Sequence, residues 1–279
     1  MQNPGAAEAQ KKIKESLGRI RFKVAVMSGK GGVGKTTVAT NLAFALAAKG
    51  LKVGLLDADI TGPNVPKMLG STKATVSHGD NGMVPVEVRP GLKAMSMGYL
   101  LEDSDRAVIW RGPMKMGVIN QFLGEVDWGD LDYLVVDLPP GTGDEPLSIA
   151  QQIPGAGALI VTTPQEVALL DARKTVTFAL QLGMPVVGIV ENMAGLTCPH
   201  CGKDVPLFKK GGGEAAANEM GVPFLGRIPI EPAIVGCSDD GVPFMTRTGS
   251  CQNAFASFSE IVARVREFCE GEETRSDEQ

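Results

Sequence analysis

One glycine-rich segment constrains this chain more than any other part of its sequence, and it comprises Gly29, Lys30, Gly31, Gly32, Val33, Gly34, Lys35, Thr36 and Thr37. It matches the pattern G-x-x-x-x-G-K-[ST] and lies between an apolar run at 22–28 and a helical stretch at 36–49. The glycines let the backbone curl so that successive N–H groups point at phosphate oxygens. Lys35 adds a positive charge, Thr36 offers a hydroxyl to Mg²⁺, and the following helix adds the positive end of its dipole. The segment therefore predicts a nucleotide-binding site.

The composition sets the size and the class of the protein. With 279 residues, of which 43% are hydrophobic and 21% charged, the chain can bury the core of one large domain. We expect that domain at 21–269, between a flexible N-terminal arm at 1–20, which can include a short helix at 11–17, and a disordered acidic tail at 270–279. A net charge of −5 argues against a general nucleic-acid binder. No apolar run is long enough to span a bilayer and no signal-peptide core is present, so we expect a cytoplasmic protein without a membrane partner.

Strand-like and helix-like segments alternate along most of the chain. Short apolar runs lie at 22–28, 52–57, 133–137, 158–162 and 186–190, and helical patterns lie at 36–49, 113–124, 167–182 and 253–269. This alternation is typical of an α/β fold with a doubly wound, mainly parallel sheet. Residues 62–100 contain four prolines and only short strand-like pieces, so we expect an excursion from that sheet.

A second lysine inside the phosphate loop narrows the class. Lys30 opens the string KGGVGKTT, which resembles the deviant Walker A loop of the MinD, ParA and nitrogenase-iron-protein class of P-loop NTPases (SIMIBI type). In that class the extra lysine reaches across a dimer interface to the partner's nucleotide. The resemblance therefore implies a homodimer, with catalytic roles for Lys30 and Lys35.

Two acidic positions follow apolar strands, where a doubly wound sheet presents its ligand-binding edge. Asp57 and Asp59 form a D-x-D pair after the second strand, and Asp137 ends the third in a Walker B arrangement. The resemblance to the deviant-loop ATPases implies that Asp59 positions or deprotonates the attacking water and that Asp57 holds a water bound to Mg²⁺. Asp137 would then lie in the outer coordination shell of the same ion.

The string DLPPGTGD at 137–144 is similar to the second switch of the Mrp/ApbC family of iron–sulfur cluster carriers. The resemblance covers about residues 20–268 and is also carried by KGGVGKTT, by Cys198 and Cys201, by WRGPM at 110–114 and by FLGRIP at 224–229. It implies that Asn192 reads the adenine base and that the backbone near Pro229 surrounds it.

Cys198 and Cys201 form a C-x-x-C pair for which three interpretations compete. The pair can be half of a [4Fe–4S] site, with a two-fold dimer supplying two thiolates from each chain. It can be a zinc knuckle, although no second C-x-x-C is present. It can also be a redox dithiol, although the thioredoxin-like context is missing. Five cysteines in a chain of this kind indicate thiols or metal ligands rather than a disulfide framework.

Together these features predict a homodimeric, Mg²⁺- and ATP-dependent ATPase that carries a labile [4Fe–4S] cluster to recipient apoproteins. The alternatives are a spatial regulator of the MinD or ParA kind and a zinc-binding P-loop ATPase. A spatial regulator needs a basic amphipathic C-terminal helix or a basic surface, whereas this chain ends in an acidic segment that begins at Glu270.

Overall fold

A computed structural model of the chain describes residues 4–101, 111–198, 200–201, 203–205, 207–247, 249 and 251–277. A mixed sheet forms its centre, in the strand order β12-β9-β8-β1-β7-β2-β6-β5. The strands are β1 (Ile20–Met27), β2 (Val53–Asp57), β5 (Val86–Arg89), β6 (Leu92–Met95), β7 (Leu131–Asp137), β8 (Gly157–Thr162), β9 (Val186–Glu191) and β12 (Phe224–Arg227). All neighbours pair in parallel except β5, which runs antiparallel to β6 at one edge.

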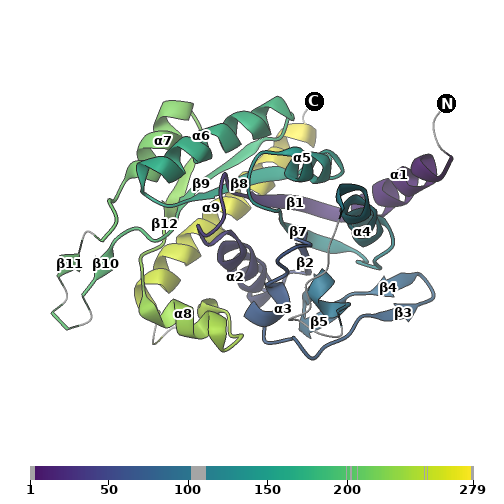
Figure 1. The fold of residues 1–279 in the computed structure, drawn as a ribbon, viewed down its shortest axis with the longest axis horizontal. Coiled ribbons are helices and arrows are strands. Elements are labelled where there is room, and N and C mark those ends of the chain that lie inside the picture. Colours follow the sequence, from purple (N-terminus) through teal and green to yellow (C-terminus); the bar gives the residue numbers. More distant parts are fainter. Residues whose placement is uncertain are drawn as a thin grey trace.

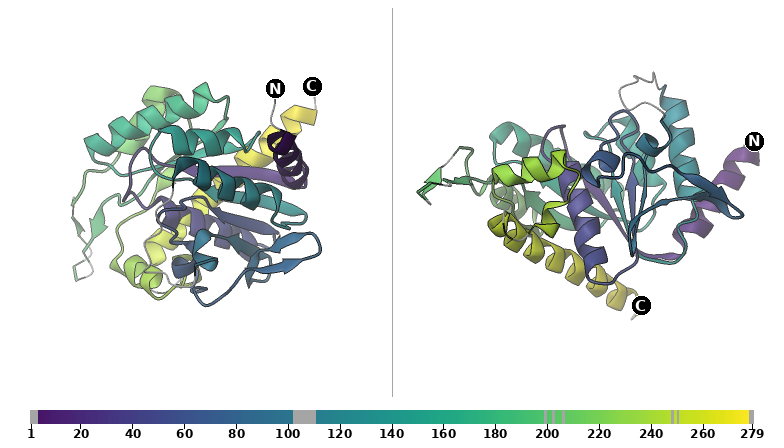
Figure 2. Two further views of the ribbon diagram at one scale, coloured as in Figure 1. Left: turned by 45° about the vertical axis from the view of Figure 1, so that its right-hand side comes forward. Right: turned by 90° about the horizontal axis from the view of Figure 1, so that it is seen from below.

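Helices cover both faces of the sheet (Figures 1 and 2). One face carries α2 (Lys35–Ala48), α3 (Val65–Met68), α8 (Pro232–Asp239) and α9 (Gln252–Asp277). The other carries α1 (Pro4–Leu17), α4 (Gly112–Gly124), α5 (Asp144–Gln151), α6 (Glu166–Gln181) and α7 (Gly212–Met220). Strand β1 shows the alternation that this requires, since Val24 and Val26 join the core on one face while Ala25 and Met27 join the core on the other. The predicted doubly wound α/β fold is confirmed.

The register of the sheet brings the two predicted acidic positions together. Strands β2 and β7 are neighbours, and Asp57 lies opposite Asp137 at the carboxyl end of both. The phosphate loop leaves the carboxyl end of β1, which is the neighbour of β7 on its other side. The residues predicted to bind the nucleotide therefore lie together at the carboxyl edge of the sheet, as expected for parallel strands.

Residues 62–100 differ from the prediction. They contain α3, a small hairpin of β3 (Ser77–Gly79) and β4 (Gly82–Val84), and the short helix η1 (Met97–Tyr99). Strands β5 and β6, however, belong to the main sheet, because β6 pairs with β2 in parallel. Pro85 and Pro90, two of the four prolines that suggested an excursion, flank the edge strand β5, as is usual at a sheet edge, whereas Pro63 and Pro66 lie just before and within α3.

Of the two alternatives for 1–20, the structure has the helix: the described residues form α1, which includes the expected helix at 11–17, and the start of β1. The expectation of a flexible arm is wrong for these residues. Ile13 and Leu17, one turn apart on α1, are both buried. Gly124 at the end of α4 lets α1 approach closely: a Cβ there would lie 3.1 Å from Cγ1 of Ile13. Burial of this apolar stripe explains why the segment packs.

The predicted disordered tail at 270–279 is also wrong for residues 270–277, which continue α9; the last two residues lie outside the described part. Two ion pairs accompany the extension. Arg266 pairs with Glu270 one turn later at 2.8 Å, and Arg21 Nε on β1 donates to Glu273 Oε1 at 2.8 Å. Across the described residues, no helix combines the length and the apolar character that a bilayer crossing needs.

Candidate functional site

The phosphate loop curls between β1 and α2 through two left-handed glycines, Gly32 (φ +79°) and Gly34 (φ +86°). Gly34 directly precedes the first residue of α2, Lys35, so the positive end of that helix faces the loop. Glycine is favoured at both positions because an L side chain rarely adopts this conformation.

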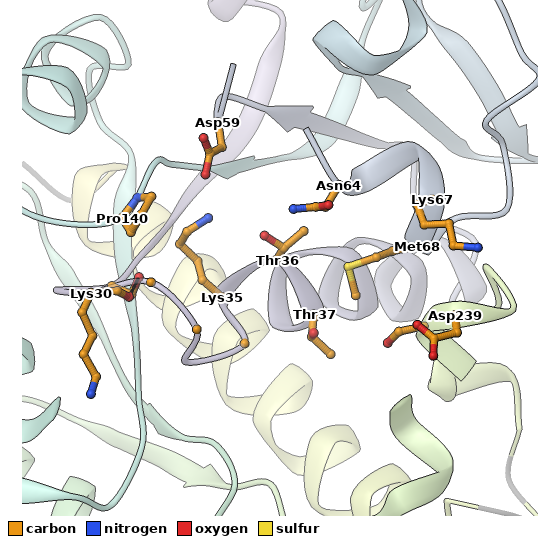
Figure 3. A pocket seen from close by; sticks show the side chains of 15 residues that line it. Lys30, Lys35, Thr36, Thr37, Asp59, Asn64, Lys67, Met68, Pro140 and Asp239 are labelled. Atoms are coloured by element: carbon orange, nitrogen blue, oxygen red, sulfur yellow. Dashed lines mark hydrogen bonds between the residues drawn. The ribbon is translucent and has the colours of Figure 1, made fainter. Parts of the chain in front are cut away.

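The loop forms one wall of a cavity of about 410 Å³ (Figure 3). Of the predicted residues, it is lined by Lys30, Gly31, Gly32, Gly34, Lys35, Thr36, Thr37 and Asp59. Pro140 of the predicted second switch lies beside them. The far wall comes from residues that the sequence reasoning missed, among them Asn64 and Lys67 around α3 and Ser238 and Asp239 at the end of α8. We call this space the phosphate cavity.

Gly29 and Val33, both predicted to bind the nucleotide, are not among the residues that line the cavity; they pack against the protein on the other side of the loop. A Cβ on Gly29 would lie 2.4 Å from the carbonyl oxygen of Asp171, so α6 packs directly on the start of the loop. The Val33 side chain is buried in the core, and its carbonyl oxygen accepts a hydrogen bond of 2.9 Å from Nδ2 of Asn192.

A buried ion pair lies at the floor of the phosphate cavity. Lys35 Nζ lies 2.6 Å from Asp137 Oδ1, and the Thr36 hydroxyl donates to Asp137 Oδ2 at 2.7 Å. The Lys35 side chain is 6% exposed and the Asp137 side chain is fully buried. Burial raises the pKa of Asp137 above its ordinary value, and the Lys35 and Thr36 contacts oppose that rise. The pair thus joins the Walker A lysine to the Walker B carboxylate.

Asp57 is held by three donors. Its Oδ2 accepts from the Ser96 hydroxyl at 2.9 Å and from the Val65 N–H at 3.2 Å, and its Oδ1 accepts from the Asp59 N–H at 3.2 Å. Burial, together with the nearby Asp137 carboxylate, raises the pKa of Asp57 to about 8. Ser96 carried no sequence signal, since its contact arises only because β6 pairs beside β2.

The oxygen groups of Thr36, Asp57 and Asp137 fit the predicted magnesium site. They comprise one hydroxyl and two carboxylates, which are the hard oxygen donors that Mg²⁺ prefers, alongside phosphate. Both carboxyls are buried and lie on neighbouring strands, so negative charge is disfavoured there, a condition that a divalent cation relieves.

The two loop lysines point in different directions. In Figure 3 the Lys35 side chain reaches toward Asp59 and Pro140, whereas the Lys30 side chain extends away from Lys35. Asp59 is partly exposed, and its Oδ1 accepts from the Thr61 hydroxyl at 3.1 Å and from the Gly62 N–H at 3.3 Å. Action of Lys30 on a partner's nucleotide and of Asp59 on water remain predictions.

A second cavity of about 390 Å³, which we call the base cavity, adjoins the phosphate cavity. Gly34, Thr37 and Ser238 line both. Asn192 and Pro229, the two predicted adenine-binding residues, lie in its wall, and most of the other side chains there are apolar. The hydrogen bond to Val33 uses one of the two N–H groups on Nδ2 of Asn192, which leaves the second N–H to donate to a base and the amide oxygen to accept from it.

Cys198 and Cys201 lie at the turn of an antiparallel hairpin formed by β10 (Leu196–Thr197) and β11 (Asp204–Val205). The Cys198 N–H donates to the Lys203 carbonyl at 2.9 Å, closing the turn. Hydrogen bonds from the backbone of Cys201 and His200, and from the Cys201 side chain, lower the pKa of the Cys198 thiol. The two thiols therefore converge. Within the described ranges, no cluster of three or more His, Cys, Asp or Glu residues could hold a metal.

The other cysteines belong to the core. Cys237 on α8, Cys251 before α9 and Cys269 on α9 are all buried. Burial raises the pKa of Cys269 to about 12, so this thiol stays protonated and unreactive. The prediction that Cys269 is a core residue is confirmed. Trp110 of the WRGPM string lies outside the described residues.

Known proteins resemble this chain over most of its length. An iron-sulfur cluster carrier protein of Methanocaldococcus jannaschii is 51% identical over 266 residues, which cover 95% of this chain and 91% of that protein. The human cytosolic Fe-S cluster assembly factor NUBP2 is 46% identical over 255 residues, covering 90% and 94% respectively.

Solved structures agree with the fold. A nucleotide-binding protein of Archaeoglobus fulgidus in complex with ADP has a TM-score of 0.75 and 45% identity, covering 84% of this chain and 92% of that one. The cell division ATPase MinD of Pyrococcus furiosus has a TM-score of 0.63 and 24% identity, covering 89% and 99%, and supports the fold alone. The expected P-loop NTPase fold of the MinD and ParA class is thereby confirmed.

The family itself is identified by a model of the ParA group described as "NUBPL iron-transfer P-loop NTPase", which matches residues 19–266. That span contains the phosphate loop, both switch segments and the cysteine pair, so it agrees with the predicted resemblance to iron–sulfur cluster carriers. This chain belongs to the NUBPL iron-transfer P-loop NTPase family.

Proposed function

We propose that this protein is an ATPase that carries a labile [4Fe–4S] cluster between two copies of the chain and transfers it to apoproteins. The homodimer would work in the cytoplasm, without nucleic acid or membrane as a partner. One observation carries the proposal: the same chain combines a built phosphate cavity with a pair of convergent thiols at a hairpin turn.

The nucleotide half of the proposal rests on the two adjoining cavities. ATP would place its phosphates against the loop and the start of α2, and its base in the apolar cavity beside Asn192. Thr36, Asp57 and Asp137 would hold Mg²⁺, which neutralises phosphate charge. Asp59 would orient the attacking water, and Lys30 would act on the nucleotide of the partner subunit. Hydrolysis would be slow and serve as a conformational switch.

The proposed binding of a cluster rests on the hairpin that carries Cys198 and Cys201. Two thiolates fill half of the positions that a [4Fe–4S] cluster requires, and a two-fold axis between two chains supplies the rest. The relatives from M. jannaschii and human, named for cluster carriage and cluster assembly, support the same cargo. A cluster at the exposed turn between two chains is accessible to a recipient, as transfer requires.

Anaerobic reconstitution with iron and sulfide, followed by a visible spectrum and a metal count, tests the proposal. We expect one cluster per dimer, or about two iron atoms per chain. Cys198→Ala and Cys201→Ala should each lose the cluster while ATP binding stays near normal. Cys269→Ala is the matched control, because this cysteine is buried in the core, and it should change neither property.

Three results would contradict the shared site. Iron near four atoms per chain would place a whole cluster on one subunit. A cluster that survives the double change of Cys198 and Cys201 would place it elsewhere. Stoichiometric zinc without iron after anaerobic preparation would assign the pair to zinc binding.

A further inference from the structure

The cysteine hairpin, by which we mean β10, the turn with Cys198 and Cys201, and β11, projects from the body of the protein in every view (Figures 1 and 2). Among the hairpin residues that the structure describes, the strands pair at two positions, Leu196 with Val205 and Thr197 with Asp204. Such a short hairpin is marginally stable by itself. Its position must therefore be set by the segments that enter and leave it.

Both of those segments line the base cavity. The chain enters the hairpin through Asn192 and Met193, and it leaves through Leu207 and Phe208; all four lie in the cavity wall. Asn192 is fixed to the phosphate loop through Val33. The opposite wall includes Pro229 and Ile230 after β12, together with residues of α8.

The entering segment is also tied to that opposite wall. Leu196 forms a bridge with Ile230, and the Ile230 N–H donates to the Gly195 carbonyl at 2.8 Å. Met193 adopts the left-handed conformation (φ 57°), which is unfavourable for a non-glycine residue and persists only where the surroundings impose it. One side of the hairpin is thus anchored. The leaving side is held farther along, where Lys209 pairs with Glu166 at 3.8 Å and the Gly211 N–H donates to Glu191 Oε1 at 3.0 Å. Between these contacts and β11, Leu207 is 56% exposed and Phe208 is half-buried where they reach the cavity.

We propose that Leu207 and Phe208 bind the base of the nucleotide, and that base binding thereby fixes the cysteine hairpin and protects its thiols. An apolar side chain that is largely exposed gains contact when a flat base fills the cavity beside it, and this contact anchors the second stem. The inference rests on the proposed function for the occupant of the cavity, a purine nucleotide. By linkage, the factor by which the bound base raises the affinity of the thiols for a cluster is also the factor by which a bound cluster raises nucleotide affinity.

Control of the hairpin by the base predicts a different nucleotide dependence from control by the γ-phosphate. ADP carries the base but lacks the γ-phosphate, so ADP and ATP should protect the thiols alike if the base acts. If the second switch or ATP-dependent dimerisation acts instead, protection should require ATP.

The experiment measures alkylation of Cys198 and Cys201 by iodoacetamide in the metal-free full-length chain, mapped by mass spectrometry. The three buried cysteines serve as internal references. Saturating Mg-ADP and Mg-ATP should each slow alkylation about fivefold or more, the lower end of the usual range for coupling between two sites. Leu207→Ala and Phe208→Ala should lose most of this protection at saturating nucleotide and should bind ADP more weakly.

Leu180→Ala is the matched control, since Leu180 on α6 is 52% exposed, close to the value for Leu207. It should behave like the parent. Protection by ATP alone, or unchanged protection in both hairpin variants, would overturn the inference. Because no iron is present, a failure of cluster carriage leaves these results unaffected and would appear only in the reconstitution.

Discussion

A Cβ added at Gly34 would approach its neighbour more closely than one added at any other glycine of the phosphate loop, and this yields a quantitative prediction for Gly34→Ala. A Cβ at this position would lie 2.2 Å from Nδ2 of Asn192, far inside van der Waals contact. The backbone there is left-handed, with φ +86°. The substitution therefore introduces backbone strain and also displaces the Asn192 amide, which donates to the Val33 carbonyl at 2.9 Å.

The two effects can be separated. Alanine in the left-handed region costs about 1–2 kcal/mol. Loss of the Asn192 hydrogen bond, which leaves a buried acceptor unpaired, costs about 1–3 kcal/mol. We expect Gly34→Ala to lower the free energy of unfolding by about 2–5 kcal/mol. Gly32→Ala is the matched control, because Gly32 is also left-handed (φ +79°) but has nothing within 4 Å of its Cβ position; it should cost about 1–2 kcal/mol.

Urea denaturation of the nucleotide-free protein, followed by circular dichroism, measures both values, with slopes compared to confirm that the unfolding reaction is the same. A double-mutant cycle with Asn192→Ala then isolates the contact. Once the Asn192 side chain is removed, Gly34→Ala should cost only its strain, so the cycle should show a coupling of about 1–3 kcal/mol. Equal losses for Gly32→Ala and Gly34→Ala, or additive effects in the cycle, would refute the reasoning.

The remaining predictions concern the loop lysines and the acidic residues. Lys35→Ala should abolish nucleotide binding and destabilise the fold by about 3–5 kcal/mol, because it strands the buried Asp137 carboxylate. Lys30→Ala should keep binding but lose most hydrolysis; titration with a fluorescent ATP analogue and a phosphate-release assay check both variants, and equal loss of binding would remove the case for a lysine acting across the dimer. Asp59→Asn should keep ATP binding and slow turnover about 10²–10⁴-fold, as for loss of a general base, so a parent-like rate would refute that role. Asp137→Asn should instead weaken the Mg²⁺ dependence of binding.

Local patterns predicted those parts of the fold that depend on local physics. The phosphate loop, β1 and α2 follow one another in sequence, so glycine spacing and apolar runs suffice to place them. The alternation of strands and helices was enough to infer a doubly wound sheet, because the handedness of parallel connections leaves few other arrangements. The pairing of Asp57 with Asp137 then follows from parallel strands that end at one edge.

Contacts between distant segments could not be predicted in this way. Strand β6 is only four residues long and contains a lysine, so its pairing with β2, and hence the Ser96 contact to Asp57, left no periodic signal. The polar composition of 1–20 suggested a loose arm, yet burial of Ile13 and Leu17 against α4 outweighs that composition. The acidic composition of 270–279 likewise suggested disorder, yet Glu273 pairs with Arg21, which only the assembled fold brings within reach.

The base cavity is the clearest case of this kind, and it bears on how the two halves of the site work together. Its wall combines Gly34, Asn192, Phe208, Pro229 and Val235, which are spread over 200 residues of sequence. In the sequence the phosphate loop and the C-x-x-C pair are separate features, since nothing in their spacing joins them. The fold joins them through one cavity, because the segments on either side of the cysteine hairpin form part of its wall. Under the proposal that the base fixes the cysteine hairpin, a ligand that fills this cavity therefore acts on the hairpin, whether or not its phosphates move the switches.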